Sequence, residues 1–327
     1  MLATVSASLE GPPSAATTPP GSGHGLVVAG LTLAAFALHA SGQWFRPLWL
    51  DEACTWWTVQ ASPLDLLGGE RTDGTPPLYF LLVWVTTRIF GEAEWALRLP
   101  SLVLAVALVP GLFWVGLRYV GERAALLAAG LAVVSPLVHY YAVEARNYAL
   151  LQALVLPLLL AFSHAMAAPD RWPRWGGVTL ALFALLYTHN WGVFLLPAPA
   201  FAVLCMGGSP RVALAALAAS VVAFVGYLPW LGIALEPASQ GISDWIVPWW
   251  DRTSFVLLRS LESFGVGGDY PPYLSYLGAA PSLRWASIPL TAALLGLAAW
   301  ASRRADPAPQ RALWAFLLVP LGSAFLF

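Results

Sequence analysis

The sequence predicts an all-α protein, a bundle of helices that crosses a lipid bilayer repeatedly. Of its 327 residues, 59% are hydrophobic and only 10% are charged, and the mean hydropathy is +0.70. Apolar stretches of about 20 residues, the length of a helix that spans a bilayer, recur along the chain. These stretches lack the alternating pattern of barrel strands, the other structure that satisfies its backbone in lipid.

The chain divides into a tail and one membrane domain. Residues 1–24 are rich in Ala, Ser, Thr, Pro and Gly without a basic cluster, which predicts a disordered tail rather than a signal peptide. Residues 25–327 form the membrane domain, and we expect it to be truncated because its last apolar run is unfinished at Phe327. About nine spans are predicted, over residues 25–45, 98–119, 124–141, 148–167, 176–188, 191–206, 212–231, 285–301 and 312–327.

Two apolar segments do not fit a single crossing. Residues 76–90 make roughly 22 Å of helix, short of the roughly 30 Å hydrocarbon core. We expect a juxtamembrane helix there, lying along the surface in the first outer loop and opened by Pro76 and Pro77. Residues 175–208 are too long for one span, and we expect two short helices broken at His189 and Asn190.

Arginines set the predicted orientation, because the chain contains no lysine. With a cytoplasmic N-terminus, arginines near helix ends fall in short inner loops, as the positive-inside rule requires. Residues 46–97, 143–148 and 232–284 then face outward, and His189 lies at the outer end of its hairpin. We therefore expect a multi-pass protein of the cell membrane whose acidic residues gather on the extracytoplasmic side.

Acidic residues in these outer segments are the candidate catalytic groups. Asp51 and Glu52 directly follow the first span, and Glu144 and Arg146 occupy the next outer turn. A sugar donor with a polyprenyl tail keeps its chain in lipid and its phosphate at the interface. There a carboxylate can take the proton of an acceptor hydroxyl that attacks the anomeric carbon. Arginine suits the leaving phosphate, because its planar fork donates two hydrogen bonds and keeps its charge.

Four segments together resemble a known family. They are LDEACT (50–55), PPLYFLLVW (76–84), FGEAEWALRLPS (90–101) and SPLVHYYAVEARNYAL (135–150). They resemble polyprenyl-phosphate-sugar-dependent glycosyltransferases of the GT-C superfamily, of the protein O-mannosyltransferase and aminoarabinose transferase type (glycosyltransferase family 39). The resemblance covers roughly residues 25–210. One departure is Thr75, where these families often have His before the Pro pair.

This resemblance implies roles for particular residues. Asp51 matches the catalytic acid and Glu144 the second acid, each in an outer loop. The segment 76–84 matches a juxtamembrane helix, and YTHNWG (187–192) is similar to the His-containing turn of such chains. The predicted catalytic residues are therefore Asp51 and Glu144. The predicted substrate-binding residues are Glu52, Asp73, Tyr141, Arg146 and His189.

The predicted function is inverting transfer of a sugar from a polyprenyl-phosphate-linked donor to a hydroxyl of a glycan, lipid or protein acceptor. Asp51 acts as the base or orients the acceptor, Glu144 assists, and Arg146, with His189, steadies the phosphate. Glu52 is expected to pack beside the site, since successive side chains point apart. Asp73 lies on the acceptor side, although a DGTPP turn explains it equally well.

Other interpretations stay open at this point. The acids could simply end helices at the water boundary, or form an interfacial ion pair of little energetic weight. A transporter would place acids mid-span in broken helices with an internal repeat. A non-catalytic lipid-binding or assembly protein of the cell envelope would tolerate loss of Asp51. The chain shows no metal-ligand spacing, though Mg²⁺ or Mn²⁺ bridging Asp51, Glu144 and the phosphate is compatible with carboxylates.

Composition and cysteine positions exclude one class of partner and one kind of cross-link. The net charge of -1 argues against nucleic acid as a partner. The two cysteines, Cys54 and Cys205, fall at opposite ends of the predicted topology and so predict no disulfide. Membrane lipids and the lipid-linked donor are the expected contacts.

Overall fold

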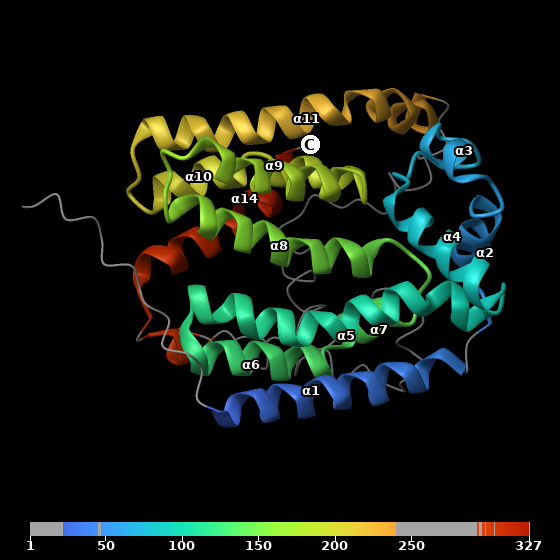
Figure 1. Ribbon diagram of the computed structural model, residues 1–327, viewed down its shortest axis with the longest axis horizontal. Helices are drawn as coiled ribbons and strands as arrows, with labels where there is room; N and C mark the ends of the chain where they lie inside the picture. The colour runs from blue at the N-terminus through green and yellow to red at the C-terminus, as the bar shows by residue number, and fades with distance from the viewer. Residues whose placement is uncertain are drawn as a thin grey trace, which may run out of the picture.

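The computed structural model describes residues 22–44, 47–239, 293, 296–297, 299–303 and 305–326. Every regular element in these ranges is a helix, which confirms the predicted all-α class (Figure 1). Most of the predicted tail lies outside the described residues. The predicted 232–284 loop lies outside them from residue 240 onward, and so does most of the predicted 285–301 span.

One half of the bundle is built on the N-terminal helices. Small apolar residues such as Ala125, Ala129 and Ala132 are buried between these helices and allow close packing. A smaller cluster of buried residues around Leu108 and Ala142 continues this core. The elements are α1 (Ser22–Ser41), η1 (Gly42–Trp44), α5 (Glu94–Tyr119), α6 (Gly121–Val134) and α7 (Pro136–Ala142).

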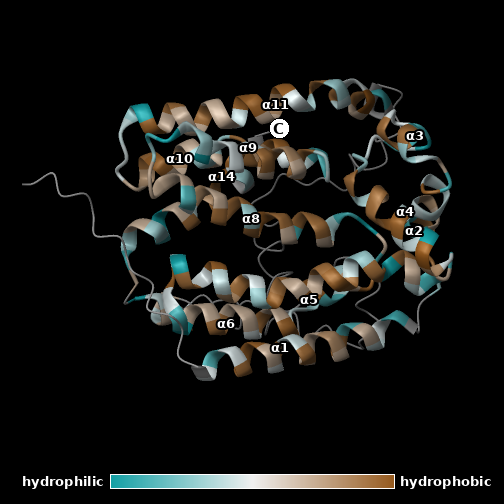
Figure 2. Cartoon of the chain, in the orientation of Figure 1, coloured by the Kyte–Doolittle hydropathy of each residue, from teal (hydrophilic) through white to brown (hydrophobic). Residues whose placement is uncertain are grey.

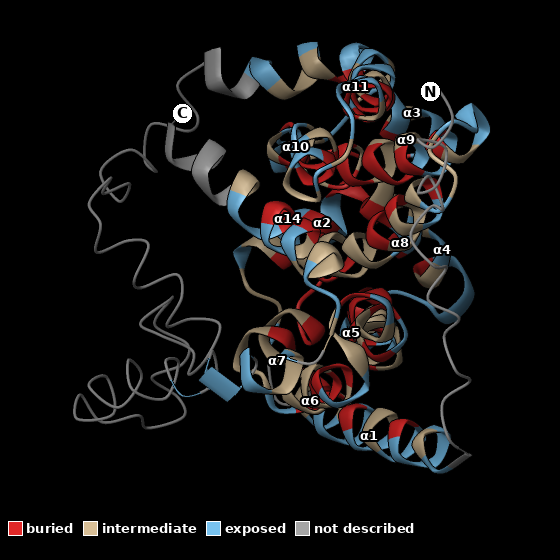
Figure 3. Ribbon diagram, turned by 90° about the vertical axis from the view of Figure 1, so that its left-hand side faces the viewer, coloured by how far each residue is buried: buried red, intermediate tan, exposed pale blue. Residues whose placement is uncertain are grey.

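The other half contains the largest core of the protein. Trp175, Phe162 and Trp230 are fully or almost fully buried there among leucines and alanines. In Figure 3 buried residues concentrate where α8, α9, α10 and α11 face one another. The elements are α8 (Tyr148–Met166), α9 (Trp172–Leu186), η2 (Asn190–Leu195), α10 (Ala198–Cys205), α11 (Pro210–Ser239) and α14 (Pro307–Leu326).

In the part of the chain that the structure describes, fewer helices qualify as spans than the nine predicted. Among the described residues, four helices are long and apolar enough to cross a membrane, and α6 with α7 makes a fifth if this bent pair is one span. The nine predicted spans are therefore not confirmed. The four segments are Gly23–Ser41, Glu94–Tyr119, Tyr148–Met166 and Pro210–Glu236.

Two helix breaks can be compared with the sequence. The predicted span over 124–141 is bent, because α6 ends at Val134 and α7 turns away from it by 56°, and the two helices together are still long and apolar enough for one span. Proline cannot continue a helix, so Pro136 starts a new one, and the Ser135 hydroxyl caps it by accepting from the backbone N–H of Val138 at 3.4 Å. The predicted break at His189 is confirmed, since it separates α9 from η2.

Polar connections gather at one end of the bundle. Three short helices lie there, at the right in Figure 1: α2 (Leu50–Thr58), α3 (Pro63–Leu67) and α4 (Leu78–Phe90). The turn 143–147 and the turn 187–189 reach the same end. The 13 residues of α4 make about 20 Å of helix, too short to span the hydrocarbon core. Figure 2 shows that the long helices between the two ends are mostly hydrophobic.

Candidate active site

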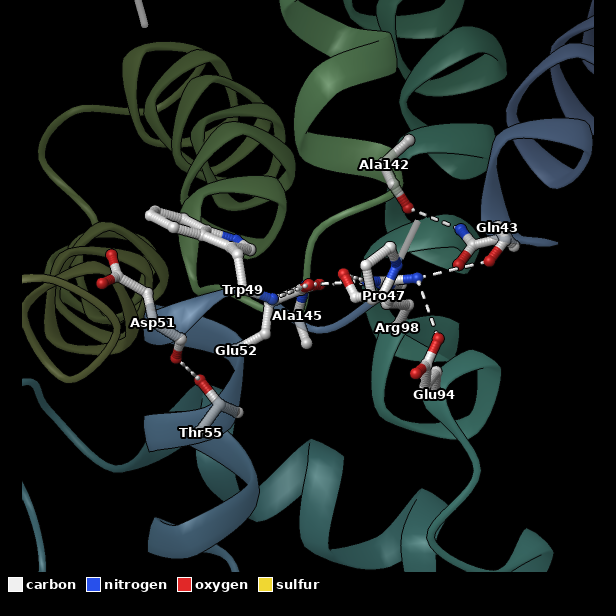
Figure 4. Close-up of polar contacts among 10 residues, drawn as sticks. All are labelled: Gln43, Pro47, Trp49, Asp51, Glu52, Thr55, Glu94, Arg98, Ala142 and Ala145. Atoms are coloured by element: carbon white, nitrogen blue, oxygen red, sulfur yellow. Dashed lines mark hydrogen bonds and ion pairs between the residues drawn. The ribbon is translucent and has the colours of Figure 1, made fainter. Parts of the chain in front are cut away.

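The two adjacent acids of α2 have opposite surroundings. Both lie in the first turn of the helix, where the helix dipole stabilises negative charge. The Asp51 side chain is 39% exposed, whereas that of Glu52 is fully buried. Figure 4 shows the Asp51 carboxylate pointing away from the contacts that surround Glu52. The structure thus makes Asp51 accessible from outside the protein and encloses Glu52 inside it.

Glu52 forms a buried ion pair with Arg98 of α5. The Arg98 Nε donates to Glu52 Oε1 at 2.7 Å, and Nη2 donates to Oε2 at 2.6 Å. Glu52 also accepts the backbone N–H of Ala145 at 2.9 Å and that of Trp49 at 3.4 Å. One carboxylate therefore joins α2, α5 and the turn 143–147.

Arg98 extends this connection toward the first helix. Its Nη1 donates to the carbonyl of Gln43 and its Nη2 to that of Pro47, both at 3.2 Å. The Gln43 amide in turn donates to the carbonyl of Ala142 at 3.0 Å. We did not predict Arg98 as a site residue. Its signal in the sequence is a single arginine near the start of an apolar helix, within the segment FGEAEWALRLPS (90–101).

A second, open cluster surrounds Arg146. Its Nε lies 4.0 Å from Asp51 Oδ2, and its Nη2 lies 3.9 Å from Asp73 Oδ2. The side chain of Arg146 is 12% exposed and that of Asp73 is 55% exposed. Both separations are longer than hydrogen bonds, so the guanidinium lies between two carboxylates without being locked to either.

Glu144 lies beside this cluster in the interior. The residue is 1% exposed, in contrast to Asp51. Burial acts to lower the pKa of Arg146, but the charges of Asp73, Tyr148, Asp51 and Glu144 outweigh it, so the pKa is raised. The structure therefore brings Asp51, Asp73 and Glu144 into the electrostatic range of one arginine.

His189 flanks the cluster as a neutral imidazole. Its Nδ1 accepts the backbone N–H of Trp191 at 3.1 Å and caps η2. Burial, followed by the charge of Arg146, lowers the pKa of His189 to about 4, and the charge of Asp73 opposes this shift only in part. With Nδ1 accepting, the neutral ring carries its proton on Nε2 and can donate it.

Tyr141 belongs to a row of aromatic rings beside Arg146. Its ring centroid lies 4.6 Å from that of Tyr148, which lies 5.6 Å from His189. The row continues to Tyr140 at 5.2 Å from Tyr141 and to Trp191 at 5.5 Å from His189. The structure thus places the predicted Tyr141 and His189 in one continuous set of contacts.

The loop that carries Asp73 is fixed to distant parts of the chain. Asp73 Oδ1 accepts the backbone N–H of Thr75 at 3.1 Å, so the expected turn is present. The next carbonyl, of Gly74, accepts from the side chains of Asn190 at 3.1 Å and Trp230 at 3.4 Å. These contacts hold the Asp73 carboxylate opposite Arg146.

Metal ligands are not grouped in the part of the chain that the structure describes. No set of three or more His, Cys, Asp or Glu residues there has a geometry that could hold an ion.

Comparison with known proteins finds similarity to one family over part of the chain. The model of the dolichyl-phosphate-mannose-protein mannosyltransferase family matches residues 74–233. The matched segment includes Glu144, Arg146 and His189, whereas Asp51 and Asp73 precede it. No curated protein and no solved structure matches the chain. The apolar helices fit a multi-pass membrane protein, and residues 74–233 are similar to this family of mannosyltransferases, which are GT-C glycosyltransferases.

Proposed function

We propose that the protein is an inverting membrane glycosyltransferase that uses a polyprenyl-phosphate-linked sugar. It transfers the sugar to an acceptor hydroxyl at the extracytoplasmic surface of the cell membrane. The donor's tail remains in lipid beside the apolar helices, and its phosphate and sugar lie at the end of the bundle that carries α2 and α4. Family similarity over residues 74–233 supports this class of reaction.

In this reaction Asp51 accepts the acceptor's proton. The acceptor oxygen forms a bond to the anomeric carbon as the bond from that carbon to the phosphate oxygen breaks. The sugar leaves with inverted configuration, and the electron pair of the broken bond goes to the polyprenyl phosphate. An exposed carboxylate suits the base, because it can reach a substrate that arrives from water.

Arg146 stabilises the phosphate that leaves. Its guanidinium is held loosely by Asp51 and Asp73, at 4.0 and 3.9 Å, and keeps donors for an anion. His189 adds a neutral Nε2–H beside it, and Tyr141 contributes to the aromatic wall. Glu144 sets the local negative potential from its buried position and orients Arg146. A Mg²⁺ or Mn²⁺ ion is not required by these roles.

The observation that carries the proposal is the convergence of Asp51 and Arg146. They lie 95 residues apart in the sequence (146 − 51), yet their side chains meet with a carboxylate and a guanidinium 4.0 Å apart. One group suits a proton acceptor and the other a phosphate ligand. At 4.0 Å the two groups form no direct hydrogen bond, so each keeps its hydrogen-bonding capacity for a substrate that lies beside them.

The position of charged residues favours an enzyme over a transporter. In the candidate spans that the structure describes, each Asp, Glu or Arg lies in the first or last two turns of its helix. A transporter would place ionisable groups at the middle of broken helices. Both proposed charges instead lie at one end of the bundle.

Transfer of labelled sugar tests this function. Membranes containing the full chain or its Asp51→Asn variant are given a lipid-linked labelled sugar and a hydroxyl acceptor. We expect Asp51→Asn to reduce transfer by about 10²–10⁴-fold, the usual weight of a general base. The matched control is Glu122→Gln at the opposite end of the bundle, which should transfer normally. Undiminished transfer by Asp51→Asn would remove this residue from the mechanism.

A further inference from the structure

The ion pair between Glu52 and Arg98 carries an inference about the placement of the proposed site residues. Glu52 follows Asp51 directly, and it accepts the backbone N–H of Ala145, which directly precedes Arg146. The Glu52 carboxylate is thus a short non-covalent connection between the open acid and the open arginine. Both side chains of the ion pair are fully buried. They are therefore shielded from substrate by the surrounding protein.

Stability alone is a poor explanation for this pair. Burying two charges has a large desolvation cost, and apolar residues of similar volume often stabilise a protein equally well or better. Apolar residues, however, form no hydrogen bonds and so cannot fix the orientation of a neighbouring group. The planar guanidinium fixes both carboxylate oxygens, which leaves Oε1 aimed at Ala145.

The pair also separates the charges of the two adjacent acids. Arg98 neutralises Glu52 inside the protein, so Arg146 remains available to Asp51 and Asp73. The backbone carbonyls of Gln43 and Pro47 occupy further donors of Arg98 and keep it turned toward Glu52. Each acid of α2 therefore has its own arginine: Glu52 has the fully buried Arg98, and Asp51 has Arg146, whose side chain is 12% exposed.

We infer that Glu52 and Arg98 are positioning residues that set the distance between Asp51 and Arg146. The inference rests on the proposed function for its effect on transfer. The distance itself is a property of the fold and can be measured whether or not sugar is transferred. Loss of the pair frees the turn 143–147 from α2 and lets Arg146 move away from Asp51.

Cross-linking measures this distance directly. In the full chain, Cys54→Ser and Cys205→Ser remove the two native cysteines, and Asp51→Cys with Arg146→Cys supply a pair for a short thiol cross-linker. The rate of cross-linking is compared with and without the double substitution Glu52→Leu/Arg98→Met. We expect the substitution to slow cross-linking about tenfold while thermal unfolding in detergent stays near that of the parent. A rate equal to that of the parent would overturn the inference.

Transfer assays on the otherwise native chain give a second readout. Glu52→Leu/Arg98→Met should lower kcat by about 10²-fold, because a displacement near 1 Å has an effect of that size. The control is His24→Gln/Glu122→Gln, which removes the ion pair whose Nδ1 and Oε1 lie 2.7 Å apart at the other end of the bundle. The control should leave both readouts unchanged. Equal transfer by a folded Glu52→Leu/Arg98→Met protein would also contradict the inference.

A conservative variant covers the case in which the double variant does not fold. Arg98→Lys keeps the charge, but an ammonium cannot match both carboxylate oxygens and two backbone carbonyls. We expect it to slow cross-linking severalfold, and an unchanged rate would overturn the positioning role. If the parent protein transfers no sugar, the proposed function fails, while the cross-linking result still decides the positioning role.

Discussion

The two arginine–carboxylate clusters at this end of the bundle, one around Arg98 and one around Arg146, differ in their hydrogen-bond distances and in their exposure to solvent. Around Arg98 every distance to Glu52 is that of a short hydrogen bond, 2.6 or 2.7 Å, and neither side chain is exposed. Around Arg146 the carboxylates stand 3.9 and 4.0 Å away and are 55% and 39% exposed. In the closed cluster, Arg98 and Glu52 form their hydrogen bonds within the protein. In the open cluster, Arg146 and its carboxylates keep donors and acceptors for a ligand. Substitutions in the two should therefore affect different properties.

The largest expected effect is on stability, from Arg98→Met. This change leaves Glu52 charged and buried without its partner, which typically destabilises a protein by about 3–5 kcal/mol. The measurement is thermal unfolding of the purified chain in a mild detergent. The comparison fails if Arg98→Met unfolds like the parent protein, since the closed cluster would then contribute no more than an exposed one.

Arg146→Lys should have the opposite profile. Lysine keeps the positive charge, and the exposed carboxylates of Asp51 and Asp73 lie 4.0 and 3.9 Å away, so we expect the loss of stability to stay below about 1 kcal/mol. Transfer should fall about 10²-fold, the usual effect of removing one donor to a developing oxyanion. Assays of kcat and of unfolding on one preparation decide the matter. A large loss of stability with normal transfer would mean that the open cluster is structural.

His189 predicts a dependence of stability on pH. Its pKa, lowered to about 4 from the ordinary 6.5, means that the folded protein binds this proton less readily than the unfolded chain. The stability that His189 contributes is therefore present above pH 6.5 and is lost as the pH falls toward 4. The loss is on the order of 3 kcal/mol once the pH has fallen to 4. His189→Asn keeps an acceptor for Trp191 and removes the titration, so its unfolding temperature should fall less between pH 6.5 and 4. Parallel curves for the two proteins would refute this.

Asp73→Asn should have the smallest effect. The amide can still cap Thr75 but no longer presents a charge to Arg146. Because the Asp73 carboxylate is exposed and lies 3.9 Å from Arg146, we expect a loss of about threefold in transfer and less than about 1 kcal/mol in stability. The same transfer assay measures it, with Asp65→Asn on α3 as the control. A loss as large as that of Asp51→Asn would place Asp73 among the catalytic residues.

Sequence alone predicted the class of fold and most of the open cluster. Apolar runs of membrane length predict helices because lipid offers no partner to the backbone. The residues that meet at Arg146 lie in turns or, for Asp51, at the start of a short helix, and the family resemblance covers these segments. Ser135 and Pro136 are a sequence signal for the start of a new helix, but the apolar run around them predicted one span over 124–141.

The closed cluster could not be predicted in the same way. Glu52 and Arg98 are 46 residues apart (98 − 52), and nothing in either local sequence states that they meet. Asp51 and Glu52 are neighbours with equal chemistry, and only the direction of each side chain on α2 separates their roles. The nine predicted spans are not confirmed among the described residues, where α9 and α10 are apolar but short, and hydropathy does not distinguish packing inside a bundle from crossing a bilayer.

The attachment of Gly74 to Asn190 and Trp230 has a consequence for biosynthesis. The closed cluster needs only residues up to 145, so it can assemble while the ribosome is still translating the second half of the chain. The Asp73 loop, in contrast, gains its anchors only after residues 190 and 230 have entered the membrane. Nascent chains halted before residue 190 would therefore contain the Glu52–Arg98 ion pair but lack the anchors of the Asp73 loop. The candidate site is thus completed late in synthesis.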